Sequence, residues 1–94
     1  MRIIFVVYKV KFLSNLTYLD LSATYISGIR SLEGLTKLTS LDLDGNKISD
    51  ISPLQYLMNL TELNLSENQI SDISALSYPY NSDSFLIDYT KNAT

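Results

Sequence analysis

Hydrophobic residues recur along this chain with a period of 22 positions. Each period begins with the spacing Leu-x-x-Leu-x-Leu, in which apolar and polar residues alternate. A short alternation is typical of a half-buried β-strand, and a fixed period of roughly 20 to 50 residues is typical of stacked repeats. The residues that are identical in all three copies are Leu16, Thr17, Leu19, Leu21, Ile26, Ser27, Ile29 and Leu32, with their equivalents 22 and 44 positions later.

The period divides the chain into three segments. Three full repeats cover 16–81, and 1–15 is expected to be a degenerate half repeat or an N-terminal cap. The remainder, 82–94, is expected to be an unfinished fourth repeat or a C-terminal cap. Extending the same period places Phe85, Ile87 and Thr90 in the strand and turn of that fourth copy.

Each repeat predicts one short strand, a turn and a return path to the next strand. Stacked strands would pair in parallel at about 4.8 Å spacing, so the predicted fold is an α/β repeat solenoid. We expect strands on its concave face at about 18–22, 40–44, 62–66 and 84–88, and 3₁₀ or irregular turns on its convex face. In the second return path Ser52 is a predicted N-cap, with Pro53 at the first helical position.

An asparagine follows the strand in the second and third repeats, at Asn46 and Asn68. A buried amide can satisfy backbone donors and acceptors in two successive coils, so these residues predict a structural ladder along the solenoid. Thr24 and Thr90 take the outer rungs at the same period. Because a hydroxyl is shorter and has one donor, the ladder is expected to weaken at both ends.

The outward side chains of the predicted strands form an acidic, hydroxyl-rich face without Lys or Arg. Two interpretations stay open. The face could bind a basic protein surface, with Tyr18 and Leu86 as apolar anchors, or it could be a solvated face kept polar for solubility. The outward positions are Tyr18, Asp20, Ser22, Ser40, Asp42, Asp44, Glu62, Asn64, Ser66, Ser84, Leu86 and Asp88.

Composition excludes much enzyme chemistry. The 94 residues contain no Cys and no His, which removes thiolate nucleophiles, imidazole bases and Cys/His zinc sites. No glycine-rich phosphate loop or nucleophile with a base appears, so we expect no enzyme, no cofactor and no metal site. Asp20, Asp42 and Asp44 would neighbour one another, but a flat row cannot easily supply the six or more ligands that calcium prefers.

Charge is distributed unevenly along the chain. Arg2, Lys9 and Lys11 give the first 11 residues a charge of +3, and the rest carries four basic against ten acidic groups, or −6. Nucleic acid is therefore not an expected partner. The apolar run at 1–7 is too short to span a bilayer, and Lys9 and Lys11 interrupt its resemblance to a signal peptide.

The segment 60–74, Leu-Thr-Glu-Leu-Asn-Leu-Ser-Glu-Asn-Gln-Ile-Ser-Asp-Ile-Ser, resembles the 22-residue leucine-rich repeats of the internalins, which are bacterial surface proteins. The segment 48–54 matches equally well, and the leucine-rich regulatory subunits of protein phosphatase are similar at the leucine positions. The resemblance covers the three full repeats. It implies a curved solenoid whose concave strand face binds another protein without catalysis, at the cell surface or after secretion.

These observations predict a non-catalytic interaction module that binds a basic partner protein through its acidic concave face. The alternative is a truncated fragment of a longer leucine-rich repeat surface protein, folded only by pairing its ends with another chain. A solenoid coil buries its apolar side only against a neighbour, so exposed ends would favour such self-association.

Overall fold

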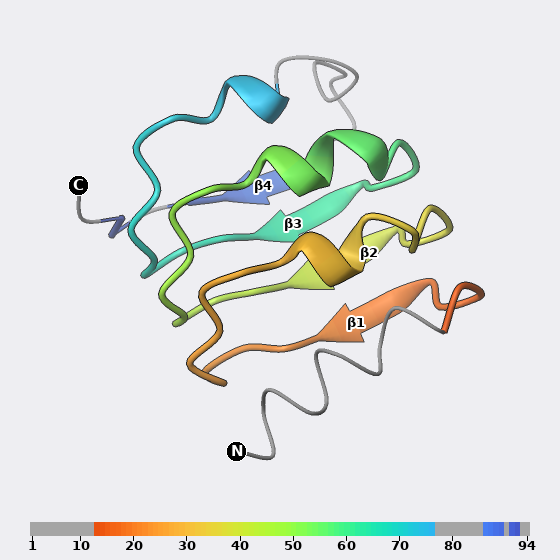
Figure 1. The fold of residues 1–94 in the computed structure, drawn as a ribbon, viewed down its shortest axis with the longest axis horizontal. Helices are drawn as coiled ribbons and strands as arrows, with labels where there is room; N and C mark the ends of the chain where they lie inside the picture. The colour runs from red at the N-terminus through yellow and green to blue at the C-terminus, as the bar shows by residue number, and fades with distance from the viewer. Residues whose placement is uncertain (1–12, 77–85, 90, 93–94) are drawn as a thin grey trace.

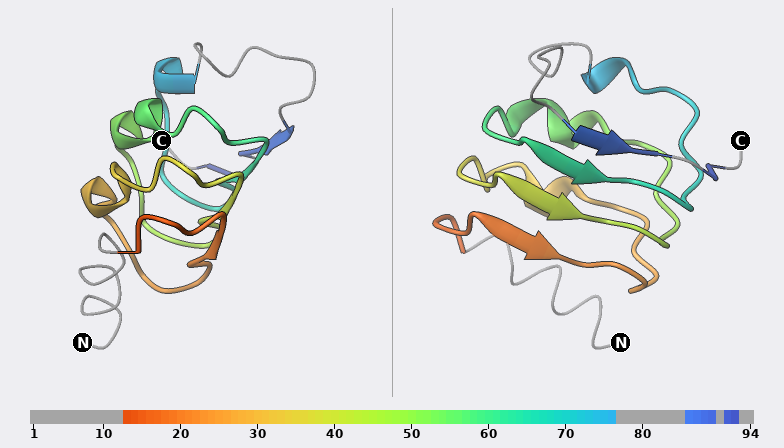
Figure 2. Two further views of the ribbon diagram at one scale, coloured as in Figure 1. Left: turned by 90° about the vertical axis from the view of Figure 1, so that its right-hand side faces the viewer. Right: turned by 180° about the vertical axis from the view of Figure 1, so that it is seen from behind.

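The computed structural model describes residues 13–76, 86–89 and 91–92. Strands and short 3₁₀ helices alternate along these residues, and each coil stacks on the preceding one (Figure 1). In Figure 2 the strands form one side of the stack and the 3₁₀ turns form the other. The elements are β1 (Tyr18–Asp20), η1 (Arg30–Leu32), β2 (Ser40–Asp42), η2 (Ser52–Tyr56), β3 (Glu62–Asn64), η3 (Ser74–Leu76) and β4 (Leu86–Asp88).

The strands form one parallel sheet in the order β1-β2-β3-β4. Leu19, Leu41 and Leu63 are in register across the first three strands, so the 22-residue period equals one turn of the coil. The parallel sheet on one face and the 3₁₀ turns on the other confirm the predicted α/β repeat solenoid.

Each strand is three residues long, and β1, β2 and β3 end two residues earlier than the alternation predicts. Side chains at the strand ends explain the difference. Oδ1 of Asp20, Asp42 and Asn64 accepts the backbone N–H two residues later, at 2.9, 3.0 and 3.0 Å. This Asx-turn bends the chain away from the extended conformation, so residues such as Ser22 lie beyond the strand.

The predicted register of the fourth strand is wrong by two residues. Leu86 pairs with Glu62 and Ile87 pairs with Leu63, a step of 24 positions rather than 22. The first residue of η3, Ser74, still follows Ser52 by 22, so the two extra residues lie between η3 and β4. Ser84 and Phe85 fall outside the described residues. The shift is even, so Leu86 stays on the outward side of the sheet.

The core is a stack of leucines and isoleucines, one layer for each coil. Leu32 and Leu54, from successive convex turns, are fully buried beneath η1 and η2. Full burial of a leucine or isoleucine contributes about 1.5 to 3 kcal/mol, and this repeated term holds the coils together. The fully buried side chains are Ile29, Leu32, Leu35, Leu38, Leu41, Leu43, Ile48, Ile51, Leu54, Leu57 and Leu65.

On the convex side, an aspartate two residues before η2 and η3 accepts the first backbone N–H of each helix. The prediction of Ser52 as N-cap is wrong, because Ser52 is the first residue of η2 and the capping position, Ile51, makes no side-chain cap bond. Instead Asp50 Oδ1 accepts the backbone N–H of Ser52 at 2.9 Å. Asp72 makes the same bond to the N–H of Ser74. Pro53 is the second residue of η2, one position later in the helix than predicted.

No helix among the described residues is long and apolar enough to cross a membrane. The apolar segment 1–7, which is expected to cap the solenoid, lies outside them. The pairing of solenoid ends with another chain also stays a prediction.

Candidate protein-binding face

A buried amide supports the turn that follows each strand. Asn46 is 7% exposed, and its Nδ2 donates to the carbonyls of Leu21 and Leu43 at 3.0 and 2.9 Å. Its Oδ1 accepts the backbone N–H groups of Thr24 and Ile26 at 3.0 and 2.9 Å. One side chain thus satisfies backbone groups in its own coil and in the preceding coil, and fixes the turn that ends the candidate face.

Asn68 repeats this arrangement one coil later. It is 3% exposed, donates to the carbonyls of Leu43 and Leu65, and accepts the N–H of Ile48. The next rung is Asn92, whose Oδ1 accepts the N–H of Ile70 at 2.9 Å and whose Nδ2 donates to the Leu65 carbonyl at 2.9 Å. Thr90, predicted for this rung, lies outside the described residues, and the 24-residue step puts Asn92 in its place.

The first rung differs from the others because it is a threonine. Thr24 Oγ1 donates to the carbonyl of Leu21, in its own coil, at 2.6 Å. It is also 3.2 Å from Oδ1 of Asn46. A hydroxyl has one hydrogen, so Thr24 cannot bridge two coils as the Asn46 amide does.

A second set of side-chain bonds lies at the opposite end of the strands. Thr39 Oγ1 donates to the Thr17 carbonyl and Thr61 Oγ1 donates to the Thr39 carbonyl, both at 3.1 Å. This threonine ladder was not among the features predicted from the sequence. The recurrence of Thr at the same position in all three repeats was the available signal. β1, β2 and β3 are therefore held at both ends by side-chain bonds between neighbouring coils.

The residue before each ladder position has a left-handed backbone. The φ angles are +53° at Ala23, +71° at Gly45, +57° at Glu67 and +58° at Lys91. Only glycine adopts this region without steric cost, so Gly45 fits the turn and the other three residues are strained. Tyr25, with φ of +62°, adds a second such residue to the first coil.

The outward side chains of the strands form an open groove, which we call the concave face. Its walls and floor include Tyr18, Ser40, Asp42, Glu62, Asn64, Leu86 and Asp88. Strand pairing arranges these residues in two rows. The anchor row is Tyr18, Ser40, Glu62 and Leu86, and the carboxylate row is Asp20, Asp42, Asn64 and Asp88.

The two ends of the anchor row are apolar and exposed. Tyr18 is 59% exposed and Leu86 is 61% exposed. The 22-residue period would have placed Leu86 beside Asn64, in the carboxylate row. The observed register moves it beside Glu62, in line with Tyr18.

Beyond the strand ends, the predicted outward positions are less accessible. Ser66 is only 8% exposed, so its assignment to an exposed binding surface is wrong. Its Oγ donates to Asp44 Oδ1 at 2.6 Å and lies 2.9 Å from Asn64 Oδ1, so the hydroxyl is paired with neighbouring side chains. Ser22 and Asp44 are half-buried. The surface available to a partner is therefore mainly the two strand rows.

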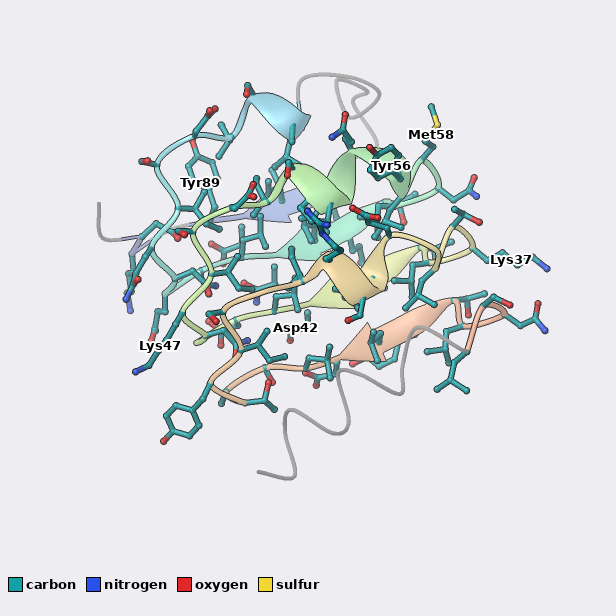
Figure 3. The ribbon with its side chains drawn as sticks, in the orientation of Figure 1. Lys37, Asp42, Lys47, Tyr56, Met58 and Tyr89 are labelled. Carbon is teal, nitrogen blue, oxygen red and sulfur yellow. The ribbon has the colours of Figure 1, made fainter. Side chains whose placement is uncertain are left out.

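Among the described residues, the charged side chains of the concave face are all negative, whereas the basic ones lie elsewhere. Carboxylates on or beside the face come from Asp20, Asp42, Asp44, Glu62 and Asp88, and no Lys or Arg of the described residues lies on the four strands. Figure 3 shows Lys37 and Lys47 extending from opposite ends of the coils. Lys37 Nζ donates to Asn15 Oδ1 at 3.0 Å, away from the groove.

Hydrogen bonds favour the ionised form of the Asp20 carboxyl group at neutral pH. The backbone N–H of Ser22, and secondly the Ser22 hydroxyl, lower the pKa of Asp20 below its ordinary value of 3.8. Asp42 accepts the N–H of Asp44 in the same geometry. The Asx-turns therefore orient one oxygen of each of these two side chains toward its own backbone.

The concave face is not arranged like a metal centre. Within 13–76, 86–89 and 91–92, no group of three or more Asp or Glu side chains is placed to hold a metal ion.

A second hollow lies on the convex side and is lined by Glu33, Gly34, Thr36, Gln55, Tyr56 and Met58. Tyr56 and Met58, labelled in Figure 3, are exposed side chains without a charge to select a partner.

Comparison with known proteins supports the repeat interpretation. A family model described as leucine-rich repeats, in two copies, matches residues 14–56 and 41–78. The fold is similar to the crystal structure of internalin C2 from Listeria monocytogenes, with 43% sequence identity and a TM-score of 0.82. That match covers 88% of this chain and 36% of the internalin chain, so this chain spans about a third of its length. A search of curated proteins found no match. The resemblance to internalins predicted from the repeats is confirmed.

Proposed function

Because the chain belongs to the leucine-rich repeat family and is similar to an internalin, we propose that its concave face binds a basic surface of another protein. Leucine-rich repeat domains are generally protein-interaction modules, and the family is generally non-enzymatic. The internalin similarity also supports a cell-surface or secreted location as part of the proposal.

The observation that carries the proposal is the separation of charge. The concave groove has carboxylates on all four strands or at their ends, whereas Arg30, Lys37, Lys47 and Lys91 lie off the strands. Complementary charge favours encounter with a basic surface and disfavours acidic ones. A face kept polar only for solubility would not require one sign of charge, so the segregation favours a binding role.

A selection experiment tests the charge preference without a known partner. The chain is immobilised and challenged with a random peptide library displayed on phage, at physiological ionic strength. We expect the selected peptides to be enriched in Lys and Arg, and to lose binding when Asp20, Asp42 and Asp88 are all replaced by Asn. Asparagine keeps an Oδ1 acceptor, as Asn64 shows, so the turns are expected to survive this change.

The matched control carries the same loss of charge on the convex side, with Asp50→Asn, Asp72→Asn and Glu33→Gln. This variant should retain the selected peptides, because its substituted residues lie on the return path rather than on the strands. Enrichment without Lys or Arg, or equal losses in both variants, would contradict the proposal.

A further inference from the structure

The register of β4 places an apolar side chain at each end of the anchor row. Tyr18 on β1 is aligned through Ser40 and Glu62 with Leu86 on β4. Building on the proposed function, we propose that the concave face binds an extended segment of its partner laid across the strands. That segment carries apolar side chains at positions i and i+4 and a Lys or Arg at i+2.

Spacing supports an extended ligand. Tyr18 and Leu86 are three strand spacings apart, which is about 14 Å at 4.8 Å per spacing. An extended chain advances about 3.4 Å per residue and alternates its faces, so residues i and i+4 are about 13.5 Å apart on the same side. The two lengths agree, and the intervening residue i+2 also faces the sheet.

The middle of the groove is chemically suited to a cation. Residue i+2 would lie above Ser40 and Glu62, where the small Ser40 side chain leaves room beside the Glu62 carboxylate. The carboxylate row runs alongside, two residues further along each strand, with Asp42 next to Ser40 in β2. A Lys or Arg at i+2 would thus meet carboxylates in both rows, without any cation of the described strands to oppose it.

A helical ligand fits this face poorly. At 1.5 Å per residue, a helix lying across the strands needs about nine residues to cover 14 Å. Nine residues correspond to about two and a half turns, so the second apolar side chain would point away from the sheet. An extended ligand running along one strand would reach only one of Tyr18 and Leu86. The anchor positions therefore favour an extended segment that crosses the strands.

Synthetic peptides test the spacing directly. The first probe is a nine-residue capped peptide with phenylalanine at its third position, arginine at its fifth, leucine at its seventh, and serine or threonine elsewhere. The second probe has the same composition with the leucine moved to the sixth position, which turns it to the opposite side of an extended chain. The third probe replaces the arginine of the first with glutamate.

Binding of the fluorescently labelled probes to the full chain is measured by anisotropy. We expect the first probe to bind at least tenfold more tightly than the second, and Leu86→Ser or Tyr18→Ser to abolish this difference. Met58→Ser is the matched control, because it removes an apolar side chain that is 58% exposed and lies outside the groove. Circular dichroism confirms that each variant is folded, and Tyr18→Phe should retain the preference for the first probe.

The outcomes separate this inference from the proposed function. Equal binding of the first two probes, with loss of binding by the third, would overturn the extended i, i+4 segment but leave the basic partner in place. Equal binding of the first and third probes would overturn the basic partner itself. Failure of the first probe to bind at 1 mM would overturn the extended segment, and the phage selection would then decide on the basic partner.

Discussion

The first and second full coils, 16–37 and 38–59, follow the same path but differ in how well their residues suit it. At the ladder position the second coil has Asn46, which bonds to two coils, whereas the first has Thr24, whose hydroxyl donates within its own coil. At the left-handed position before it, the second coil has Gly45 and the first has Ala23.

On the convex side too, the residues of the second coil suit the turn better than those of the first. In the second coil Asp50 accepts a backbone N–H at the start of η2 and Pro53 occupies its first turn. The equivalents in the first coil are Gly28, which has no side chain to accept a bond, and Ser31. The Ser31 hydroxyl is buried, and it has no hydrogen-bond partner among the described residues. Correspondingly, η1 has three residues and η2 has five.

Both coils nevertheless keep the same layer of core side chains, since Leu32 and Leu54 are both fully buried. The shared core layer indicates that apolar burial determines the path of a coil, and we expect the turn residues to determine how much stability the coil adds. Restoring or removing the turn residues should therefore change stability without changing the fold.

The largest expected effect is on the ladder. Asn46→Ala leaves several buried backbone groups of two coils without partners, at about 1 to 3 kcal/mol each, so we expect a loss of about 3 kcal/mol or more. Thr24→Ala should cost about 1 kcal/mol, because one local hydroxyl bond is lost. Urea unfolding followed by circular dichroism measures both. Equal losses in the two variants would show that the rungs do not differ.

The buried hydroxyl of the first coil offers a gain in stability. Ser31→Ala removes a buried polar atom without a partner, and should raise the free energy of unfolding by roughly 1 to 2 kcal/mol. Ser49→Ala, at an exposed position of the second coil, is the control and should change it by less than about 0.5 kcal/mol. A loss of stability in Ser31→Ala would mean that the hydroxyl is satisfied in solution.

The left-handed position should respond in opposite directions in the two coils. Gly45→Ala is expected to cost about 1 kcal/mol, and Ala23→Gly to gain up to about 1 kcal/mol. A methyl group on Gly45 would approach Ala23 no closer than 3.7 Å, so the cost is conformational rather than steric. Chemical denaturation of the two variants checks the signs, and a gain from Gly45→Ala would exclude backbone strain as the cause.

The smallest expected effect depends on pH. Gly28→Asp should recreate in the first coil the turn that Asp50 makes in the second, and Gly28 has open space for a side chain. The gain should be about 0.5 kcal/mol at pH 7, by analogy with capping carboxylates. The backbone N–H of Ser52 lowers the pKa of Asp50 below 3.8, and we expect a carboxylate at position 28 to respond likewise.

The sign of the pH dependence follows from that lowered pKa. A carboxyl group with a lower pKa in the folded state stabilises fully above the unfolded value, and this stability is lost as the pH falls through the folded value. The gain of Gly28→Asp over wild type should therefore be present at pH 7 and smaller at pH 2. Gly28→Asn, which makes the turn but does not titrate, should keep its advantage at both pH values. An undiminished gain of Gly28→Asp at pH 2 would contradict this explanation.

The 22-residue period was sufficient to predict the strands, the parallel stacking and the buried rungs Asn46 and Asn68. Residues one period apart occupy the same place in successive coils, so each coil packs against the next in the same way. It could not predict where the strands end. That depends on whether side chains such as Asp42 compete for backbone N–H groups at the end of the alternation. The threonine ladder also needed the structure, because the acceptor of Thr39 belongs to a different coil.

The candidate face was predicted in part. The alternation correctly separated outward from inward residues on the strands. Even in β4, a shift of two residues leaves every side chain on the same side of the sheet. It placed Leu86 in the wrong row, because extending a period assumes a constant length for the return path. It also counted Ser66 as exposed, whereas that hydroxyl is drawn toward Asp44.

The ladders give the stack a direction. Asn46 satisfies groups of the coil before it, at Leu21 and Ile26, and Thr39 donates back to Thr17 in the same sense. A coil is therefore chemically complete only after its successor has formed. During synthesis, which proceeds from the N-terminus, each new coil supplies the side chains that bond to the buried backbone groups of the coil already made. Removal of the last coil would leave buried backbone groups of the preceding coil without side-chain partners, whereas removal of the first coil would leave the Asn46 amide without its partners at Leu21, Thr24 and Ile26.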